Sequence, residues 1–508
     1  MTLWIGLHLH SLSLDTWRLR WLTEPSAAAV FEHDALIALT PGAQQCGLRL
    51  GMRCATVRSL APECLLYPRD PHAEQNAYAQ AAHAALAYSP SVYQHANATL
   101  LIDVTYSLRL FGGIRLIVQE LRQQLKCLKL QVQSSVAPTA TGAWLLAQAA
   151  RHSTQQSAQR STQQSAQHST QPSPRYACGQ ETLERLLNPL PCAMLPSAQP
   201  HLVWLNAIGC ETLGGLRALP REGLQRRVGT AILNELGQAY TQTVWRQTPY
   251  VAPEQFIEQL DLLDRLEHTA ALSAFLERLA LSLCTWLAAK QYTLRSATLE
   301  LHHERGRHAC PPTTLELAFG EPVWLLGQLM PLLHERLSRQ NLAGPVVALT
   351  LRSQALAAQS TRSATLFPDP LHAPADYRRL LDLLCARLGA EQILQPLPLP
   401  DHRPEIANNW VSIGTSTVVA ASIESPLSER PFWLLAEPLA LTVHDDRPIY
   451  YGPLQLMRGP ERIESGWWDH LRIARDYFVA QDQQAVRYWI YRERDTEQAR
   501  WFLHGLFA

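Results

Sequence analysis

Apolar residues in the first 150 positions form short runs and helically spaced series. Residues 3–9 and 100–104 are apolar runs of the length of buried strands. A helix is predicted over 71–88, and apolar side chains spaced three or four residues apart over 117–128 predict a second, amphipathic one. Residues 130–136 then alternate between apolar and polar side chains, as a half-buried strand does. This order of elements predicts a ferredoxin-like α+β fold.

A polar repeat interrupts the chain at 152–175. It reads HSTQQSAQ, RSTQQSAQ, HSTQPSPR and is almost free of apolar side chains. A segment of this composition cannot bury a core, so it is expected to be a disordered insertion.

Glycines and arginines mark the helical segment that follows the repeat. Residues 204–237 place Gly209 and Gly214 ahead of a helix, a pattern typical of a helix-hairpin-helix. Such a hairpin directs backbone N–H groups and helix N-termini at a DNA phosphate. The arginines that can add phosphate contacts are Arg217, Arg221, Arg226 and Arg227. An ordinary helical turn with surface arginines explains the same residues, and this alternative stays open.

The second half of the chain predicts a small α/β domain, a linker and an aromatic-rich β region. A leucine-rich helix is predicted over 255–288, and strands and a further helix over 298–351. Residues 353–375 are rich in Ala, Ser and Pro without a period, so they read as a linker. Aromatic side chains at the density found near the C-terminus make either a compact β core or an exposed partner-binding face.

Composition limits the class of protein. A chain of 508 residues is too long for one hydrophobic core, and 47% hydrophobic with 17% charged residues is typical of globular domains. The formal net charge is zero, so any contact with DNA has to come from local patches. The cysteines include no CxxC pair, and we expect no metal site and no cofactor. With no leader-like N-terminus and no long apolar run, a cytoplasmic protein without membrane contact is expected.

Four stretches carry a family resemblance. They are DVTYSLRLFGG at 103–113, GPERIESGWW at 459–468, Arg475-Asp476-Tyr477, and WFLHGLFA at 501–508. Residues 1–355 resemble the Y-family translesion DNA polymerases, and the other stretches resemble the ImuB subgroup, polymerase-like subunits of bacterial mutasomes. The resemblance implies an α+β right hand with a C-terminal domain. Its parts are palm and fingers (1–150, fingers about 30–70), the polar insertion (151–175), a helix-hairpin-helix thumb (176–250), a little-finger-like domain (251–355), a linker (356–375) and a partner-interaction domain (376–508).

The resemblance also implies that the catalytic groups have been lost. Polymerase chemistry uses two divalent cations held by several carboxylates. The family has an aspartate on the first palm strand, where this chain has Gly6 or His8, and an Asp-Glu pair on the second, which we match to Asp103 and Val104. The fingers' triphosphate-binding Tyr and Arg fall on Pro41 and Gln44. A non-catalytic protein is therefore expected, with Asp103 as a remnant that accepts local hydrogen bonds.

Members of the subgroup are understood to be adaptors at damaged DNA. The partners so implied are DNA, the sliding clamp, a RecA-like accessory protein (ImuA) and an error-prone C-family polymerase (ImuC), in SOS-induced mutagenesis. The clamp-binding match is Thr365, Leu366 and Phe367, although the family's Gln is missing at Ser363. The candidate partner-binding residues are Trp467, Trp468, Trp501 and Phe502.

Two other hypotheses remain open. The chain can be an active low-fidelity translesion polymerase whose atypical metal site uses His8, Asp15 and Asp103. It can also be a plain DNA-binding protein with a vestigial palm. Primer extension with Mg²⁺ or Mn²⁺ separates the first of these from the adaptor, and co-purification with the implied partners separates the second.

Overall fold

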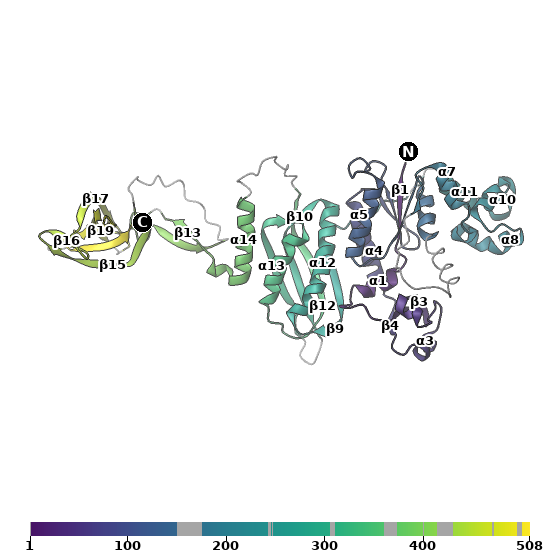
Figure 1. Ribbon diagram of the computed structural model, residues 1–508, viewed down its shortest axis with the longest axis horizontal. Coiled ribbons are helices and arrows are strands. Elements are labelled where there is room, and N and C mark those ends of the chain that lie inside the picture. The colour runs from purple at the N-terminus through teal and green to yellow at the C-terminus, as the bar shows by residue number, and fades with distance from the viewer. Residues whose placement is uncertain are drawn as a thin grey trace. The chain divides into compact units, whose positions relative to one another are not determined.

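The computed structural model describes residues 2–149, 175–241, 245, 247–304, 310–359, 373–399, 401–413, 430–469, 472–494 and 500–507. The chain divides into two compact units, Met1–Leu383 and Leu384–Ala508 (Figure 1). Almost the whole polar repeat lies outside the described residues.

The first unit contains a five-stranded sheet in the order β5-β6-β1-β7-β8. The strands are β1 (Trp4–His8), β5 (Val92–His95), β6 (Thr99–Asp103), β7 (Gln133–Ala137) and β8 (Arg175–Tyr176). The accompanying helices are α1 (Leu12–Arg18), α4 (Pro71–Leu86), α5 (Ile114–Cys127) and one over residues 140–149. The strands and helices predicted in this region are thus confirmed, within a few residues at each end.

Alternation along the palm strands sends side chains to two cores. Ile5, Leu7 and Ile102 pack in one core with apolar residues of α4 and α5. Leu101, on the opposite face, packs in a second core with Ala143 and Trp144 of the helix over 140–149. That second face carries Gly6 and His8, because they alternate with Ile5 and Leu7.

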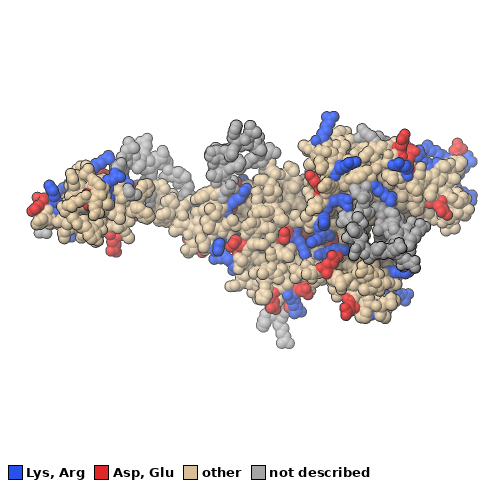
Figure 2. Space-filling view, in the orientation of Figure 1, with Lys and Arg blue, Asp and Glu red and all other residues tan. Residues whose placement is uncertain are grey.

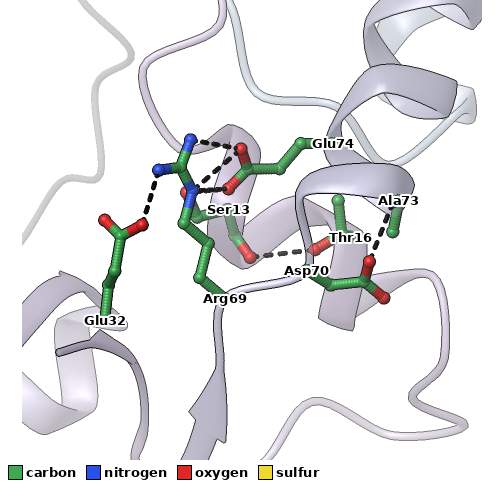
Figure 3. A network of polar contacts seen from close by, with 7 residues as sticks. All are labelled: Ser13, Thr16, Glu32, Arg69, Asp70, Ala73 and Glu74. Carbon is green, nitrogen blue, oxygen red and sulfur yellow. Dashed lines mark hydrogen bonds and ion pairs between the residues drawn. The ribbon is translucent and has the colours of Figure 1, made fainter. Parts of the chain in front are cut away.

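The fingers form a small sheet in the order β3-β2-β4. Their elements are β2 (Ala28–Glu32), β3 (Ala35–Leu39), α2 (Pro41–Gln45), α3 (Cys54–Leu60) and β4 (Leu65–Pro68). Arg69 joins them to the palm: its guanidinium lies between Glu32 of β2, at 2.9 Å, and Glu74 of α4, at 2.8 Å (Figure 3). Asp70 caps α4 by accepting the Ala73 N–H.

The thumb is helical and the little-finger-like domain is an α/β sandwich. The thumb contains α7 (Gln180–Leu187), α8 (Leu202–Ala207), α9 (Leu213–Ala218), α10 (Arg221–Val228) and α11 (Ala231–Tyr240), with 3₁₀ turns at Cys192–Met194 and Pro196–His201. The next domain contains β9 (Ile257–Leu266), α12 (Thr269–Lys290), β10 (Tyr292–His303), β11 (Thr313–Val323), α13 (Leu326–Ser338) and β12 (Val346–Ala358), with sheet order β11-β10-β12-β9.

Two predictions for this domain are corrected. The helix predicted over 255–288 was wrong in its first part, because β9 pairs with β12 there and the helix begins only at Thr269. The linker predicted from 353 was wrong at its start, because β12 runs to Ala358. Among the described helices, α12 alone is long and apolar enough to cross a membrane. Its buried Leu276, Leu283 and Trp286 account for that composition as core packing.

The second unit is a β structure preceded by α14 (Ala373–Leu388), in which the division between the units falls. Its described strands are β13 (Leu394–Pro398), β14 (Asn408–Ser412), β15 (Trp433–His444), β16 (Arg447–Ile449), β17 (Gln455–Ser465), β18 (Ile473–Gln481), β19 (Arg487–Glu493) and β20 (Trp501–Leu506). β13 and β14 form a hairpin, and the others form one sheet in the order β16-β15-β20-β19-β18-β17. Apolar clusters lie on both faces of this larger sheet.

Candidate functional site

The register of the palm sheet determines which side chains share a site. His8 lies opposite Thr99 on one side and Gln133 on the other, and Thr99 lies opposite His95. These four residues form one row across the sheet, which we call the His8 row.

Asp103 does not belong to the His8 row. It lies opposite Trp4, four residues away along β1 and hence about 13 Å from the row. Asp103 shares the face of Gly6 and lies two residues along β1 from it, whereas the residue that faces His8 on β6 is Thr99. Sequence analysis missed Thr99 and His95, since neither belongs to a recognisable motif.

Gly6 is excluded as an acid position by packing. A Cβ at this residue would lie 2.6 Å from the carbonyl oxygen of Ala143 and 2.8 Å from Ser135 Oγ. The helix over 140–149 is thus packed directly against the backbone of β1, and no carboxylate side chain fits there. Neither Gly6 nor His8, the two first-strand positions considered from the sequence, therefore carries a carboxylate in this chain.

The His8 row contains imidazole, hydroxyl and amide groups and no carboxylate. His8 Nδ1 lies 3.2 Å from Thr99 Oγ1, and the His95 ring stacks on Trp144 with centroids 4.8 Å apart. Burial lowers the pKa of His95, which favours its neutral form. Magnesium prefers hard oxygen ligands with negative charge, so these four residues are a poor site for two Mg²⁺ ions. No cluster of three or more His, Cys, Asp or Glu suited to a metal occurs among the described residues.

Asp103 has a local structural role. Its Oδ1 accepts hydrogen bonds from the backbone N–H of Thr105, at 3.0 Å, and from the Thr105 hydroxyl, at 2.6 Å. Thr105 Oγ1 in turn accepts the N–H of Leu3 at 3.0 Å. The carboxylate therefore fixes the turn that ends β6, and the neighbouring Val104 is fully buried.

The alternative ligand set of His8, Asp15 and Asp103 is not assembled. Asp15 is fully buried, pairs with Arg18 at 2.7 Å and accepts the N–H of Gln131 at 2.8 Å. Burial raises the pKa of Asp15 to about 7, although Arg18 acts in the opposite direction. Asp15 is hydrogen-bonded to Gln131, Asp103 is hydrogen-bonded to Thr105, and His8 lies beside Thr99. Each of the three side chains therefore has its own partner.

The fingers place Pro41 and Gln44 on α2, where both are exposed. Pro41 begins the helix, and Thr40 caps it by accepting the Ala43 N–H at 3.3 Å. Neither residue supplies a cationic donor for a triphosphate. The exposed arginines Arg49 and Arg53 lie farther along the same segment, and sequence analysis did not consider them.

The predicted thumb residues separate into structural and exposed groups. Gly209 has a φ of +74° at the turn between α8 and α9, a conformation that favours glycine. Gly214 has a role inside the thumb: its N–H donates to the Asn188 carbonyl at 3.0 Å, and a Cβ there would lie 3.0 Å from Asn188 Cβ. Arg217 is already engaged, since it pairs with Glu184 at 3.1 Å and lies over the Tyr240 ring.

Three arginines of α10 remain directed toward solvent. Arg221, Arg226 and Arg227 are exposed, and Arg227 lies 5.9 Å from the centroid of the Trp204 ring. Guanidinium groups in such positions can form forked hydrogen bonds to phosphate oxygens.

The little-finger-like sheet carries an acidic outer face. Thr298 lies opposite Glu316, Glu300 lies opposite Thr350, and Asp261 lies opposite Ala348. The cation on these rows is Arg352, which pairs with Glu300 at 3.4 Å. Phosphate contacts are therefore better supported on the thumb than on this sheet. Figure 2 shows both basic and acidic side chains on the molecular face in view.

The four aromatic partner-binding candidates do not share one environment. Trp467 and Trp468 are 73% and 57% exposed and pack edge to face with centroids 4.6 Å apart. Trp501 is buried in the β core, and Phe502 stacks on Tyr491 at 5.1 Å. Assigning Trp501 to a partner surface was wrong, because it is buried in the sheet core, whereas Phe502 is half-buried against the apolar cluster on the other face. The clamp-binding candidates Thr365, Leu366 and Phe367 lie outside the described residues.

The part of the chain that forms the fingers and much of the palm matches a known protein family. Residues 19–148 match the impB/mucB/samB family. These residues form the fingers and much of the palm, and the described chain has a C-terminal β domain in addition.

The chain is also similar to curated ImuB proteins. It is 25% identical over 495 residues to Protein ImuB of Caulobacter vibrioides (strains NA1000 / CB15N and ATCC 19089 / CIP 103742 / CB 15), with 91% of this chain and 100% of the relative covered. Solved structures that match include a Dbh ternary complex, at 14% identity over 69% of this chain and 98% of that one. An insertion ternary complex of Dbh DNA polymerase matches at 13% over 70% and 99%, and both have TM-scores of 0.36.

Proposed function

We propose that the chain is a non-catalytic adaptor of translesion synthesis that binds damaged primer-template DNA in the cytoplasm. The observation that carries this proposal is the His8 row, in which the position facing His8 is a threonine and no carboxylate is present. Two-metal phosphoryl transfer needs several carboxylates in the palm, and Gly6, His8 and Val104 supply none of them. A polymerase fold that lacks them retains the ability to bind DNA.

The proposed adaptor contacts its partners through separate parts of the chain. Leu366 and Phe367 insert into the apolar pocket of the sliding clamp. The exposed Trp467–Trp468 pair receives the RecA-like accessory protein or the error-prone C-family polymerase, since exposed tryptophans are frequent interface hot spots. These assignments apply to SOS-induced mutagenesis, the process in which the ImuB subgroup is understood to act.

Co-purification tests the partner assignments. Tagged full-length protein should retain the clamp, the RecA-like protein and the C-family polymerase in a pulldown. Leu366→Ala with Phe367→Ala should abolish clamp retention only, and Trp467→Ala with Trp468→Ala should reduce retention of one of the other two. Clamp retention unchanged in the first variant would move the clamp site elsewhere. If the variant with Trp467→Ala and Trp468→Ala retains all partners, the tryptophan pair is excluded as a partner-binding site.

Charge removal from α10 should weaken binding to primer-template DNA. In Arg226→Gln with Arg227→Gln, the logarithm of the association constant should fall less steeply with the logarithm of salt concentration. The expected reduction in slope is about 1.8, because each duplex phosphate contact contributes about 0.9. Fluorescence anisotropy between 50 and 200 mM salt measures it, roughly the range in which such contacts are lost. Arg217→Gln is the control for a thumb arginine already paired with Glu184, and an equal change in its slope would contradict the assignment.

A further inference from the structure

The C-terminal sheet contains arginines gathered around one buried carboxylate. Asp476 of β18 lies opposite Arg462 of β17 and Arg492 of β19, so the three residues form one row. Arg494 follows the end of β19, and its side chain approaches the same carboxylate. We call Arg462, Arg492 and Arg494 the arginine cluster.

The buried carboxylate of Asp476 pairs with all three guanidinium groups of the arginine cluster. Its side chain is 1% exposed, and the nitrogen-to-oxygen distances are 2.9 Å from Arg462, 3.5 Å from Arg492 and 3.9 Å from Arg494. The arginine side chains are 55%, 44% and 35% exposed in the same order. The carboxylate therefore orients the guanidinium groups while their outer N–H groups face solvent.

The arginine cluster has more positive charge and more donors than its acids neutralise. Besides Asp476, Glu464 pairs with Arg494, which leaves one net positive charge among five groups. Each guanidinium has five N–H donors, and two carboxylates cannot accept all of them. The remaining donors suit an anion with several oxygen acceptors, such as a phosphodiester.

The spacing of the arginine cluster suits a single nucleic-acid backbone. β17 and β19 flank β18, so Arg462 and Arg492 start about 10 Å apart across the sheet. Arg492 also lies over the Trp501 ring at 5.9 Å, which restricts its motion before binding. A row of oriented guanidiniums contacts successive phosphates of one strand without needing helix termini or a groove.

We propose that the arginine cluster binds the sugar-phosphate backbone of single-stranded DNA. This site lies in the second unit, and it is independent of the thumb arginines assigned above to primer-template DNA. It gives the adaptor a contact for template that has not been copied. An acidic protein segment is the competing occupant, and the experiment below separates the two.

The test compares full-length variants binding fluorescent dT30 and a blunt 30-base-pair duplex. Arg492→Gln with Arg494→Gln leaves the closest Asp476 pair, Arg462, intact. This variant should bind dT30 about tenfold more weakly at 0.1 M salt, with a salt slope lower by about 1.4. Its duplex binding should stay within twofold of the wild type. The matched control is Arg447→Gln with Arg458→Gln, two exposed arginines elsewhere on the sheet, and it should leave dT30 binding unchanged.

Unchanged dT30 binding in the cluster variant overturns the proposal and favours the acidic segment. An equal loss of dT30 binding in the control variant also overturns the proposal. A loss confined to the duplex overturns it as well. Arg492→Lys with Arg494→Lys keeps the charge but removes the planar fork, so it should give an intermediate loss if the cluster acts as described. This variant keeps the test valid if the Gln variant fails to fold. The α10 variant should lose duplex and keep dT30 binding, so failure of the thumb assignment is seen separately.

Discussion

Purified full-length protein should extend no primer on an undamaged or lesion-bearing template, with either Mg²⁺ or Mn²⁺. The expected deficit relative to an active polymerase is at least about 10⁶-fold, on the scale of enzymatic rate enhancement. The reason is the His8 row, in which His8, Thr99, His95 and Gln133 offer no anionic oxygen to a metal. Denaturing gel electrophoresis of a labelled primer measures the extension.

Two variants make the primer-extension result decisive. If any extension is found, His8→Ala and Thr99→Ala should be tested, because they alter the row where the metal would lie. Extension lost in both would sink the non-catalytic proposal. Asp103→Ala removes the remaining palm carboxylate of the alternative ligand set, so extension lost in this variant would also overturn the proposal; without extension it should only lower stability, since it removes the acceptor for Thr105.

Gly6→Ala should destabilise the palm by about 3 kcal/mol or more. The added Cβ would lie 2.6 Å from the Ala143 carbonyl oxygen, a backbone atom that cannot move without shifting the helix over 140–149. Gly6→Asp should be worse, because it adds an unpaired charge in the same closed space. Chemical denaturation followed by circular dichroism measures the loss.

The control for Gly6 is another glycine of the same unit. Gly237 lies in α11 and a Cβ there meets nothing within 4 Å, so Gly237→Ala should stabilise by about 0.5–1 kcal/mol. A Gly6→Ala protein as stable as the wild type would show that β1 and the helix can separate. In that case the exclusion of Gly6 as an acid position would no longer hold.

Several structural elements followed from the sequence because their signals are local. The strands at 3–9 and 100–104 and the helix at 117–128 depend on consecutive apolar positions, and the structure has them as β1, β6 and α5. The β9 segment was mistaken for helix because its leucines fit both periods. Pairing with β12 decided the matter, and no local pattern records such pairing.

The candidate sites depended on contacts between distant residues. Asp103 was expected to accept local hydrogen bonds, but only the structure shows that its partner is Thr105 and that Thr99 is the residue opposite His8. Gly214 resembled a DNA-contacting glycine until its packing against Asn188 was visible. Trp501 resembled a surface residue until the sheet enclosed it.

The sequence by itself determined the periodic elements, the polar repeat and the resemblance to Y-family polymerases. Tertiary structure alone decided which residues share the His8 row, why Gly6 has no side chain, and that three arginines surround Asp476. The physical reason is that hydrophobic periodicity is a property of neighbouring residues, whereas strand register is set by turns and by the packing of the whole sheet. Residues far apart in the chain become a site only when that register brings them into one row.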